Sequence, residues 1–307
     1  MQKPYVPFFL MAAWICLLCH SCSTCSRQQQ DNMEIVDKND LKEDSAYVEI
    51  AQKVFYSLPT PIEMSILIKN LGIEYQASLL NDPMSVSKYV THSKMAINFG
   101  IYVTDLVYAG LFNQTQTMLR YKLAIQKIVE ALGLSAAVDN NLLKKLEEDI
   151  NNKDDLLRIL AEIYSSCSAH LNDDTNRKFL IISTLVGGWV EGMYIASSLT
   201  NENLAINEKQ IEQLVIDQKL TFDMIWQAMS DAQKIQEVPE IAALMSEMTV
   251  LAQAFDKIKV DQTQSNVKFD EKSQTSVIES VSLSSIDAEA FTEIKQQIQT
   301  LRHNFIK

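Results

Sequence analysis

The sequence predicts an all-α protein, a bundle of about eight to nine helices around two buried apolar helices, with a small C-terminal β-hairpin before the last helix. The stretch 95–116 carries one charge, Asp105, and the stretch 185–199 also carries one, Glu191. A surface helix needs a polar face, so segments that are apolar on every side are buried in a core or span a membrane. Five of the seven glycines lie in these stretches: Gly100, Gly110, Gly187, Gly188 and Gly192. Because an interior glycine costs a helix about 1 kcal/mol relative to alanine, this concentration predicts that the two helices pack closely against each other.

Capping signals mark several helix ends. Thr60-Pro61 begins a helix, with a capping threonine, a proline at the first helical position and a glutamate at the third. Leu71-Gly72-Ile73 ends that helix, because glycine can adopt the left-handed conformation and the isoleucine can pack back on the last turn. Leu132-Gly133-Leu134 repeats this stop signal. Asp82-Pro83 is expected to open the helix that leads into residues 95–116, and a turn near Gln114 ends it.

Apolar residues recur at helical spacing along the rest of the chain. We predict further helices over residues 47–55, 118–132, 140–150, 154–171, 176–199, 207–233, 239–258 and 286–306. Residues 260–285 are polar and richer in β-branched side chains, which predicts a hairpin of residues 266–269 with 276–283.

The first 26 residues have the pattern of an export signal. One lysine precedes an apolar run over residues 6–18 that is too short to span a bilayer, for which about 20 residues are needed. Four cysteines lie within or just after this run, Cys16, Cys19, Cys22 and Cys25, as in a lipoprotein signal whose acylated cysteine becomes the first mature residue. We assign Cys22 because the small Ser21 precedes it. Cys19, Cys25 and ordinary cleavage near Thr24 are the alternatives.

This assignment divides the chain into three parts. Residues 1–21 form the signal peptide, residues 22–43 a flexible tether and residues 44–307 the helical domain. The stretch 179–199 could instead span a membrane, because its 21 residues carry one charge and contain Gly188-x-x-x-Gly192. A carboxylate at mid-membrane costs about 2.5–3.5 kcal/mol on insertion scales, and the remaining helices are amphipathic and acidic. A buried core helix is therefore favoured.

The net charge of −12 argues against nucleic acid as a partner, since phosphate binding needs a basic face and the chain has no cluster of lysines or arginines. No motif predicts a metal or a cofactor either. There is no His-Glu-x-x-His and no phosphate loop, and the four histidines are scattered: His20, His92, His170 and His303. A four-cysteine metal cluster is disfavoured because those cysteines adjoin the export signal.

Cys167 is the only thiol of the predicted helical domain. It lies at helical spacing with Leu160 and Ile163, so we interpret it as a small buried apolar residue. Pairing with Cys25, and activation as a nucleophile by His170, are less favoured alternatives.

A polar stripe within the first apolar helix marks the candidate site. At 100° per residue, six positions fall near one line: Asn98, Tyr102, Asp105, Ala109, Phe112 and Gln116. The motif Asp105-x-x-Tyr108 is matched by Glu191-x-x-Tyr194 in the second helix. If the two helices form a ligand-binding site between them, its candidate residues are Asn98, Tyr102, Asp105, Tyr108, Trp189, Glu191 and Tyr194.

The two carboxyls allow two interpretations. Burial would raise both pKa values and make them useful as an acid or a base. They could equally be core acids whose hydrogen bonds fix the helix register, and this structural interpretation is favoured. Two carboxylates without a metal, a histidine or a nucleophile do not define a reaction.

Two motifs resemble a family of uncharacterised exported lipoproteins of Bacteroidota. The first comprises Leu80, Asn81, Pro83, Lys88, Tyr89, Lys94, Ala96, Asn98, Gly100, Tyr102, Asp105, Leu106, Tyr108 and Gln114, and the second is Gly188-Trp189-x-Glu191-x-x-Tyr194. The resemblance runs from about residue 59 to the C-terminus. It implies a helical exported protein without an assigned activity, and it carries over no catalytic residues.

Together these features predict an envelope lipoprotein that does not bind nucleic acid. A lipid would anchor it to the outer membrane, with the helical domain facing the periplasm. It would bind a protein or small-molecule partner without catalysis. The alternative is an enzyme, such as a hydrolase, that uses Asp105 and Glu191.

Lipidation is expected at Cys22. The mature protein extracted from membranes should begin at Cys22 and carry acyl mass, and intact mass spectrometry measures both. Cys22→Ser should abolish the acyl mass, whereas Cys16→Ser should leave it unchanged. A mature N-terminus at Cys25 or beyond without acyl mass would contradict the assignment.

Overall fold

The computed structural model describes residues 74–138, 179–198, 204–235, 237–260, 264–270, 275–281 and 284–307, with single positions between 141 and 170. All of these residues belong to the same compact unit. The described part is mostly helical, which confirms the all-α class. The predicted helices over 47–55 and 60–71 lie outside the described residues, as do most of those over 140–150 and 154–171.

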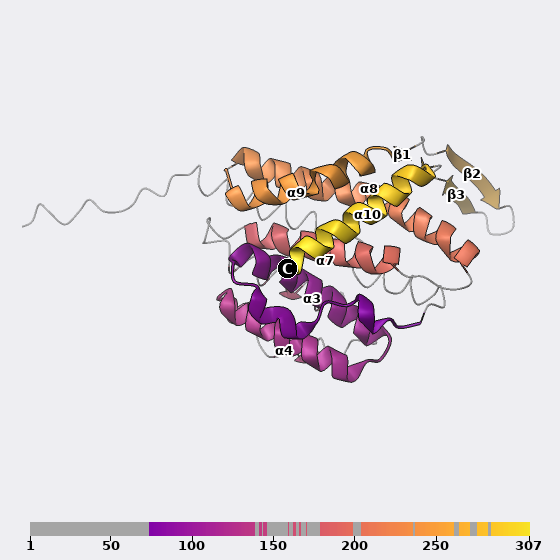
Figure 1. Ribbon diagram of the computed structural model, residues 1–307. Helices are drawn as coiled ribbons and strands as arrows, with labels where there is room; N and C mark the ends of the chain where they lie inside the picture. Colours follow the sequence, from indigo (N-terminus) through magenta and orange to yellow (C-terminus); the bar gives the residue numbers. More distant parts are fainter. Residues whose placement is uncertain are drawn as a thin grey trace, which may run out of the picture. The chain divides into compact units, whose positions relative to one another are not determined.

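The two apolar stretches form α3 (His92–Leu111) and α7 (Phe179–Ser198), which lie side by side at the centre of the described bundle (Figure 1). Their backbones nearly touch at two glycines. A Cβ atom added to Gly100 would lie 2.0 Å from the Thr184 carbonyl oxygen, and one added to Gly187 would lie 2.0 Å from that of Ile97. The Thr104 hydroxyl donates across the interface to the Gly188 carbonyl oxygen at 3.2 Å. The predicted packing of these two helices is thereby confirmed.

The segment before α3 differs from the prediction. Asp82-Pro83 opens a short 3₁₀ helix, η2 (Pro83–Lys88), which follows another, η1 (Ala77–Leu79), and neither continues into α3. The chain is extended at Tyr89, and α3 begins anew with Thr91 as its N-cap. Tyr89 is buried and its hydroxyl accepts a hydrogen bond from the Asn81 side chain at 3.0 Å, so a tertiary contact interrupts the helix.

Two left-handed residues shape the ends of the next helix, α4 (Thr115–Ala131). Asn113, with φ 56°, makes the turn out of α3, and Gln114 is the N-cap of α4. Gly133 has φ 66°, and the Leu134 N–H donates to the Val129 carbonyl oxygen at 2.8 Å. The stop signal at Leu132-Gly133-Leu134 is therefore confirmed.

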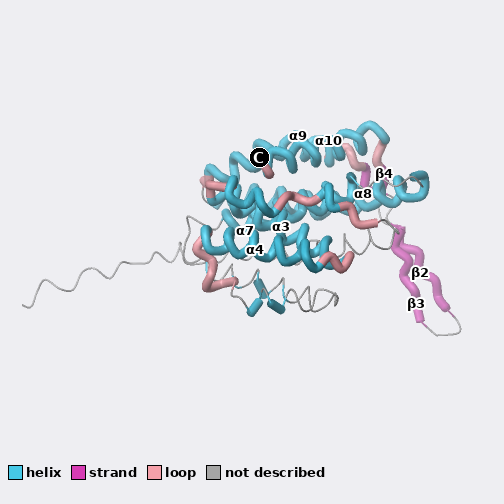
Figure 2. Tube along the Cα trace, turned by 60° about the horizontal axis from the view of Figure 1, so that its bottom comes forward, coloured by secondary structure: helices cyan, strands magenta, loops and turns pink. Residues whose placement is uncertain are grey.

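The C-terminal helices pack on the other side of the α3–α7 pair from α4 (Figures 1 and 2). They are α8 (Leu204–Ile235), α9 (Pro239–Phe255) and α10 (Ala288–Phe305). An aromatic cluster joins α7, α8 and α9, since Trp189 contacts both Phe222 and Phe255, whose rings stack at 4.6 Å. Asp287 caps α10 by accepting a hydrogen bond from the Ala290 N–H.

Short strands lie between α9 and α10. Strand β1 (Lys259–Val260) pairs antiparallel with β4 (Ser284–Ser285), and β2 (Gln264–Asp270) pairs antiparallel with β3 (Thr275–Val281). In the second pair Val267 lies opposite Ile278.

Within the described residues, α7 is the one helix whose length and composition would let it cross a membrane. Of its most apolar 18-residue window, 89% is buried among other parts of the protein. This burial supports the interpretation of α7 as a core helix.

The α3–α7 contact predicts opposite effects for two glycine substitutions. Gly100→Ala should destabilise the protein by about 3 kcal/mol, the upper part of the usual range for overpacking, because its Cβ atom would meet backbone atoms that cannot rotate away. Gly192→Ala should be neutral or stabilise the protein by up to about 1 kcal/mol, since no atom lies within 4 Å of its added Cβ. Urea unfolding followed by circular dichroism measures both. Equal losses in the two variants would contradict the close backbone contact.

Candidate functional site

The two carboxyls predicted to form the site meet at the α3–α7 interface. Asp105 of α3 and Glu191 of α7 are both completely buried, and their carboxyl groups lie within hydrogen-bonding reach of each other. The glycine contacts between the helices bring the two side chains together, because they hold the backbones against each other one to two turns away. This arrangement matches the expectation drawn from the equivalent positions of the two acids.

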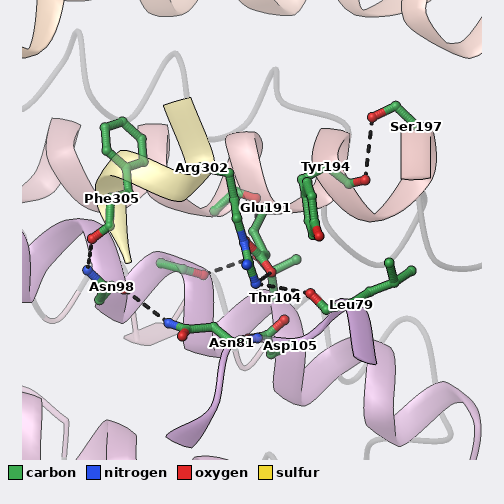
Figure 3. Close-up of polar contacts among 12 residues, drawn as sticks. Leu79, Asn81, Asn98, Thr104, Asp105, Glu191, Tyr194, Ser197, Arg302 and Phe305 are labelled. Carbon is green, nitrogen blue, oxygen red and sulfur yellow. Dashed lines mark hydrogen bonds and ion pairs between the residues drawn. The ribbon is translucent and has the colours of Figure 1, made fainter. Parts of the chain in front are cut away.

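Arg302 of α10 completes the cluster, and the sequence analysis missed it. Its Nε donates to Glu191 Oε2 and its Nη2 to Glu191 Oε1, both at 3.0 Å (Figure 3). Nη2 also donates to the Leu79 carbonyl oxygen at 3.0 Å, and the guanidinium lies 4.4 Å from the centre of the Tyr194 ring. A signal was present in the sequence. Arg302 lies four residues after Ile298 and three before Phe305, on the apolar face of an amphipathic helix, where an arginine needs a buried partner.

Asn81 links the cluster to the rest of the polar stripe. Its backbone N–H donates to Asp105 Oδ2 at 3.1 Å, and its side-chain amide donates to Asn98 Oδ1 at 3.2 Å. Its carbonyl oxygen accepts a hydrogen bond from the Tyr121 hydroxyl of α4 at 2.8 Å. Asn98 in turn donates to the Phe305 carbonyl oxygen at the end of α10 at 2.9 Å. Asn81 therefore connects the segment before α3 to both α3 and α4, and through Asn98 it is linked to α10.

Two tyrosines of α3 also bind backbone groups of residues 76–82. The Tyr102 hydroxyl donates to the Asp82 carbonyl oxygen at 3.0 Å, and the Tyr108 hydroxyl accepts from the Gln76 N–H at 3.2 Å. Buried backbone groups outside regular structure need such partners. Tyr102 and Tyr108 thus hold residues 76–82 in place, because few backbone groups of this segment are paired within a helix.

Trp189 and Tyr194 lie in different surroundings. The Trp189 indole N–H donates to Gln218 Oε1 of α8 at 3.1 Å, inside the aromatic cluster rather than beside the carboxyls. Tyr194 is half-buried and covers one face of the Arg302 guanidinium. Of the seven candidate residues, Asn81 contacts Asn98 and Asp105, and Arg302 contacts Glu191 and Tyr194. Tyr102 and Tyr108 bind the backbone of residues 76–82 instead, and Trp189 lies apart. Whether they bind a ligand stays a prediction.

Burial dominates the electrostatics of the cluster. It raises the pKa of Asp105 well above its ordinary value of 3.8, and the charge of Glu191 raises it further, against the opposing effect of Arg302. Burial also raises the pKa of Glu191, although the charge and hydrogen bonds of Arg302 act in the opposite direction. Burial raises the pKa values of Tyr102 and Tyr121, so both phenols remain hydrogen-bond donors.

In the part of the chain that the structure describes, no group of three or more His, Cys, Asp or Glu side chains is placed so that it could hold a metal ion. The cysteines of the export signal and Cys167 lie outside the described residues. Comparisons with protein-family models, with curated proteins and with solved structures find no match to this chain.

Arg302→Met should destabilise the protein by about 3–5 kcal/mol, because it leaves the Glu191 charge buried without its partner. Adding Glu191→Leu to this variant should recover most of the loss, since an apolar pair replaces the ion pair. Chemical unfolding measures each free energy. Lys234→Met is the control, because it breaks an exposed ion pair with Asp231 and should have little effect. A double variant as unstable as Arg302→Met would show that lost packing, not an unpaired charge, causes the effect.

Proposed function

We propose that this chain is a lipid-anchored envelope protein whose helical domain binds a partner or a small ligand and catalyses no reaction. One observation carries the non-enzymatic part. The two candidate catalytic carboxyls are completely buried, and groups of the chain itself hold them, Arg302 on Glu191 and the Asn81 N–H on Asp105.

A general acid or base must come within hydrogen-bonding distance of the atom whose proton it transfers. At Asp105 and Glu191 a substrate would have to displace Asn81 or Arg302. Asn81 makes three other buried hydrogen bonds, and Arg302 makes one more, to the Leu79 carbonyl oxygen. Such a cluster acts most simply as a core element that fixes helix register. The raised pKa of Asp105 is the feature that keeps the enzymatic alternative open, since catalytic acids share it.

The N-terminal sequence supports the cellular location. The export signal and its cysteines favour a lipid anchor at Cys22, and the residues that follow, Ser23-Thr24-Cys25-Ser26-Arg27, contain no acid. In the Bacteroidota lipoproteins that the chain resembles, acidic residues there often accompany surface display. We therefore propose an outer-membrane anchor with the domain in the periplasm, which protease treatment of intact cells tests.

We also propose a finer architecture for the whole domain. It would comprise eight or nine helices, with the β2–β3 pair as a hairpin before α10. The helical spacing of residues 47–55, 140–150 and 154–171 supports this number.

A thermal-shift experiment tests the binding role and its location. An extract of envelope metabolites should raise the melting temperature of the wild-type protein and of Asp105→Asn equally, because Asp105 is completely buried and is held by another group of the chain. A shift in the wild type that Asp105→Asn abolishes would instead place the ligand at the polar stripe. If no extract shifts either protein, a small-molecule ligand is excluded and a protein partner remains the proposal.

A further inference from the structure

Three ionisable groups meet in the core, and their charges do not balance if all are ionised. Asp105, Glu191 and Arg302 are buried together, Arg302 with 8% of its surface exposed and the acids with none. One guanidinium supplies one positive charge, whereas two carboxylates would supply two negative charges. An uncompensated charge in the interior is so unfavourable that the group binds or releases a proton instead.

The hydrogen bonds indicate which acid holds the proton. Both oxygens of Glu191 accept N–H bonds from Arg302, the bidentate geometry of a guanidinium on a carboxylate. Asp105 Oδ2 accepts the Asn81 N–H, but Asp105 Oδ1 is buried and has no donor among the described residues. A carboxylate oxygen without a donor is costly, whereas a protonated oxygen carries a hydrogen to donate.

We propose that Asp105 holds a bound proton at neutral pH and donates it to the Glu191 carboxylate, which makes the Asp105–Glu191–Arg302 cluster electrically neutral. Asp105 then accepts from Asn81 through one oxygen and donates through the other, so both of its oxygens are hydrogen-bonded. The raised pKa of Asp105 agrees with this assignment. The proton is a structural component of the core, and the inference depends neither on export nor on the lipid anchor.

The other titratable groups that interact with the cluster, among the described residues, are tyrosines. They are Tyr75 and Tyr89 before α3, Tyr102 in α3, Tyr121 in α4 and Tyr194 in α7. Neutral phenols add no charge, so they leave the balance of the three charged groups unchanged. The proton on Asp105 is what brings that balance to zero.

A bound proton links stability to pH with a definite sign. The folded state keeps the Asp105 proton at pH values where the unfolded chain, with a pKa near 3.8, has released it. Raising the pH from about 4 toward the folded pKa therefore removes stability from the wild type. Asp105→Asn has no such proton and should gain melting temperature relative to the wild type over this range.

Infrared spectroscopy of the full-length protein tests the protonation state directly. At pH 7 the wild type should show the C=O stretching band of a protonated carboxyl group, and Asp105→Asn should lack it. Asp217→Asn, which changes an exposed residue of α8, is the matched control and should keep the band. A wild type without the band, or a band that persists in Asp105→Asn, would overturn the proposal.

Melting temperatures give a second readout. Asp105→Asn reproduces the shape and the donor of the protonated acid, so it should lower the melting temperature at pH 7 by less than about 4 °C. Glu191→Gln should lower it by more than about 6 °C, because it removes the carboxylate that Arg302 binds through two hydrogen bonds. If Glu191→Gln does not fold, the pH dependence of Asp105→Asn against the wild type still decides. A difference between those two proteins that stays constant from pH 4 to pH 8 would refute the bound proton, as would the reverse order of the two losses.

Discussion

The structure depends on the burial of one arginine against two acids. Glu191 on the central helix has no access to water, so its charge is tolerable only where Arg302 reaches it with both hydrogen bonds. That requirement fixes where α10 lies, since its last turns must place the guanidinium at the α3–α7 interface. Once it is there, the same guanidinium also holds the Leu79 carbonyl oxygen and stacks on Tyr194.

Polar side chains of α3 extend this constraint to residues 76–82. That segment has backbone groups that no helix or strand satisfies, and Asp105, Tyr102 and Tyr108 supply their partners. Asn81 then connects the segment to α4 through Tyr121. Residues far apart in the sequence are thus joined by polar side chains. Each of these side chains would destabilise the core if it were buried without its partner.

In this arrangement other groups of the chain hold the two carboxyls of the candidate site. Catalytic groups are also oriented by hydrogen bonds to the protein, but a reacting acid or base must in addition come within hydrogen-bonding distance of its substrate. Here both oxygens of Glu191 and one oxygen of Asp105 accept hydrogen bonds from other groups of the chain, whereas Asp105 Oδ1 is buried without a donor among the described residues. A satisfied buried network gives a fold a unique arrangement more readily than it gives a reaction.

The sequence by itself determined the helical class, the pairing of the two glycine-bearing helices and the stop at Gly133, because apolar spacing, glycine placement and capping are local patterns. It also placed Asp105 and Glu191 at one interface. The tertiary structure alone decided that the chain breaks at Tyr89, that Trp189 belongs to an aromatic cluster and that Arg302 completes the site. Arg302 lies 111 residues from Glu191 along the chain, and helical periodicity could show that it was buried without showing its partner. Which distant residues become partners is decided only when the helices pack, because each buried charge must then lie beside a group that neutralises it.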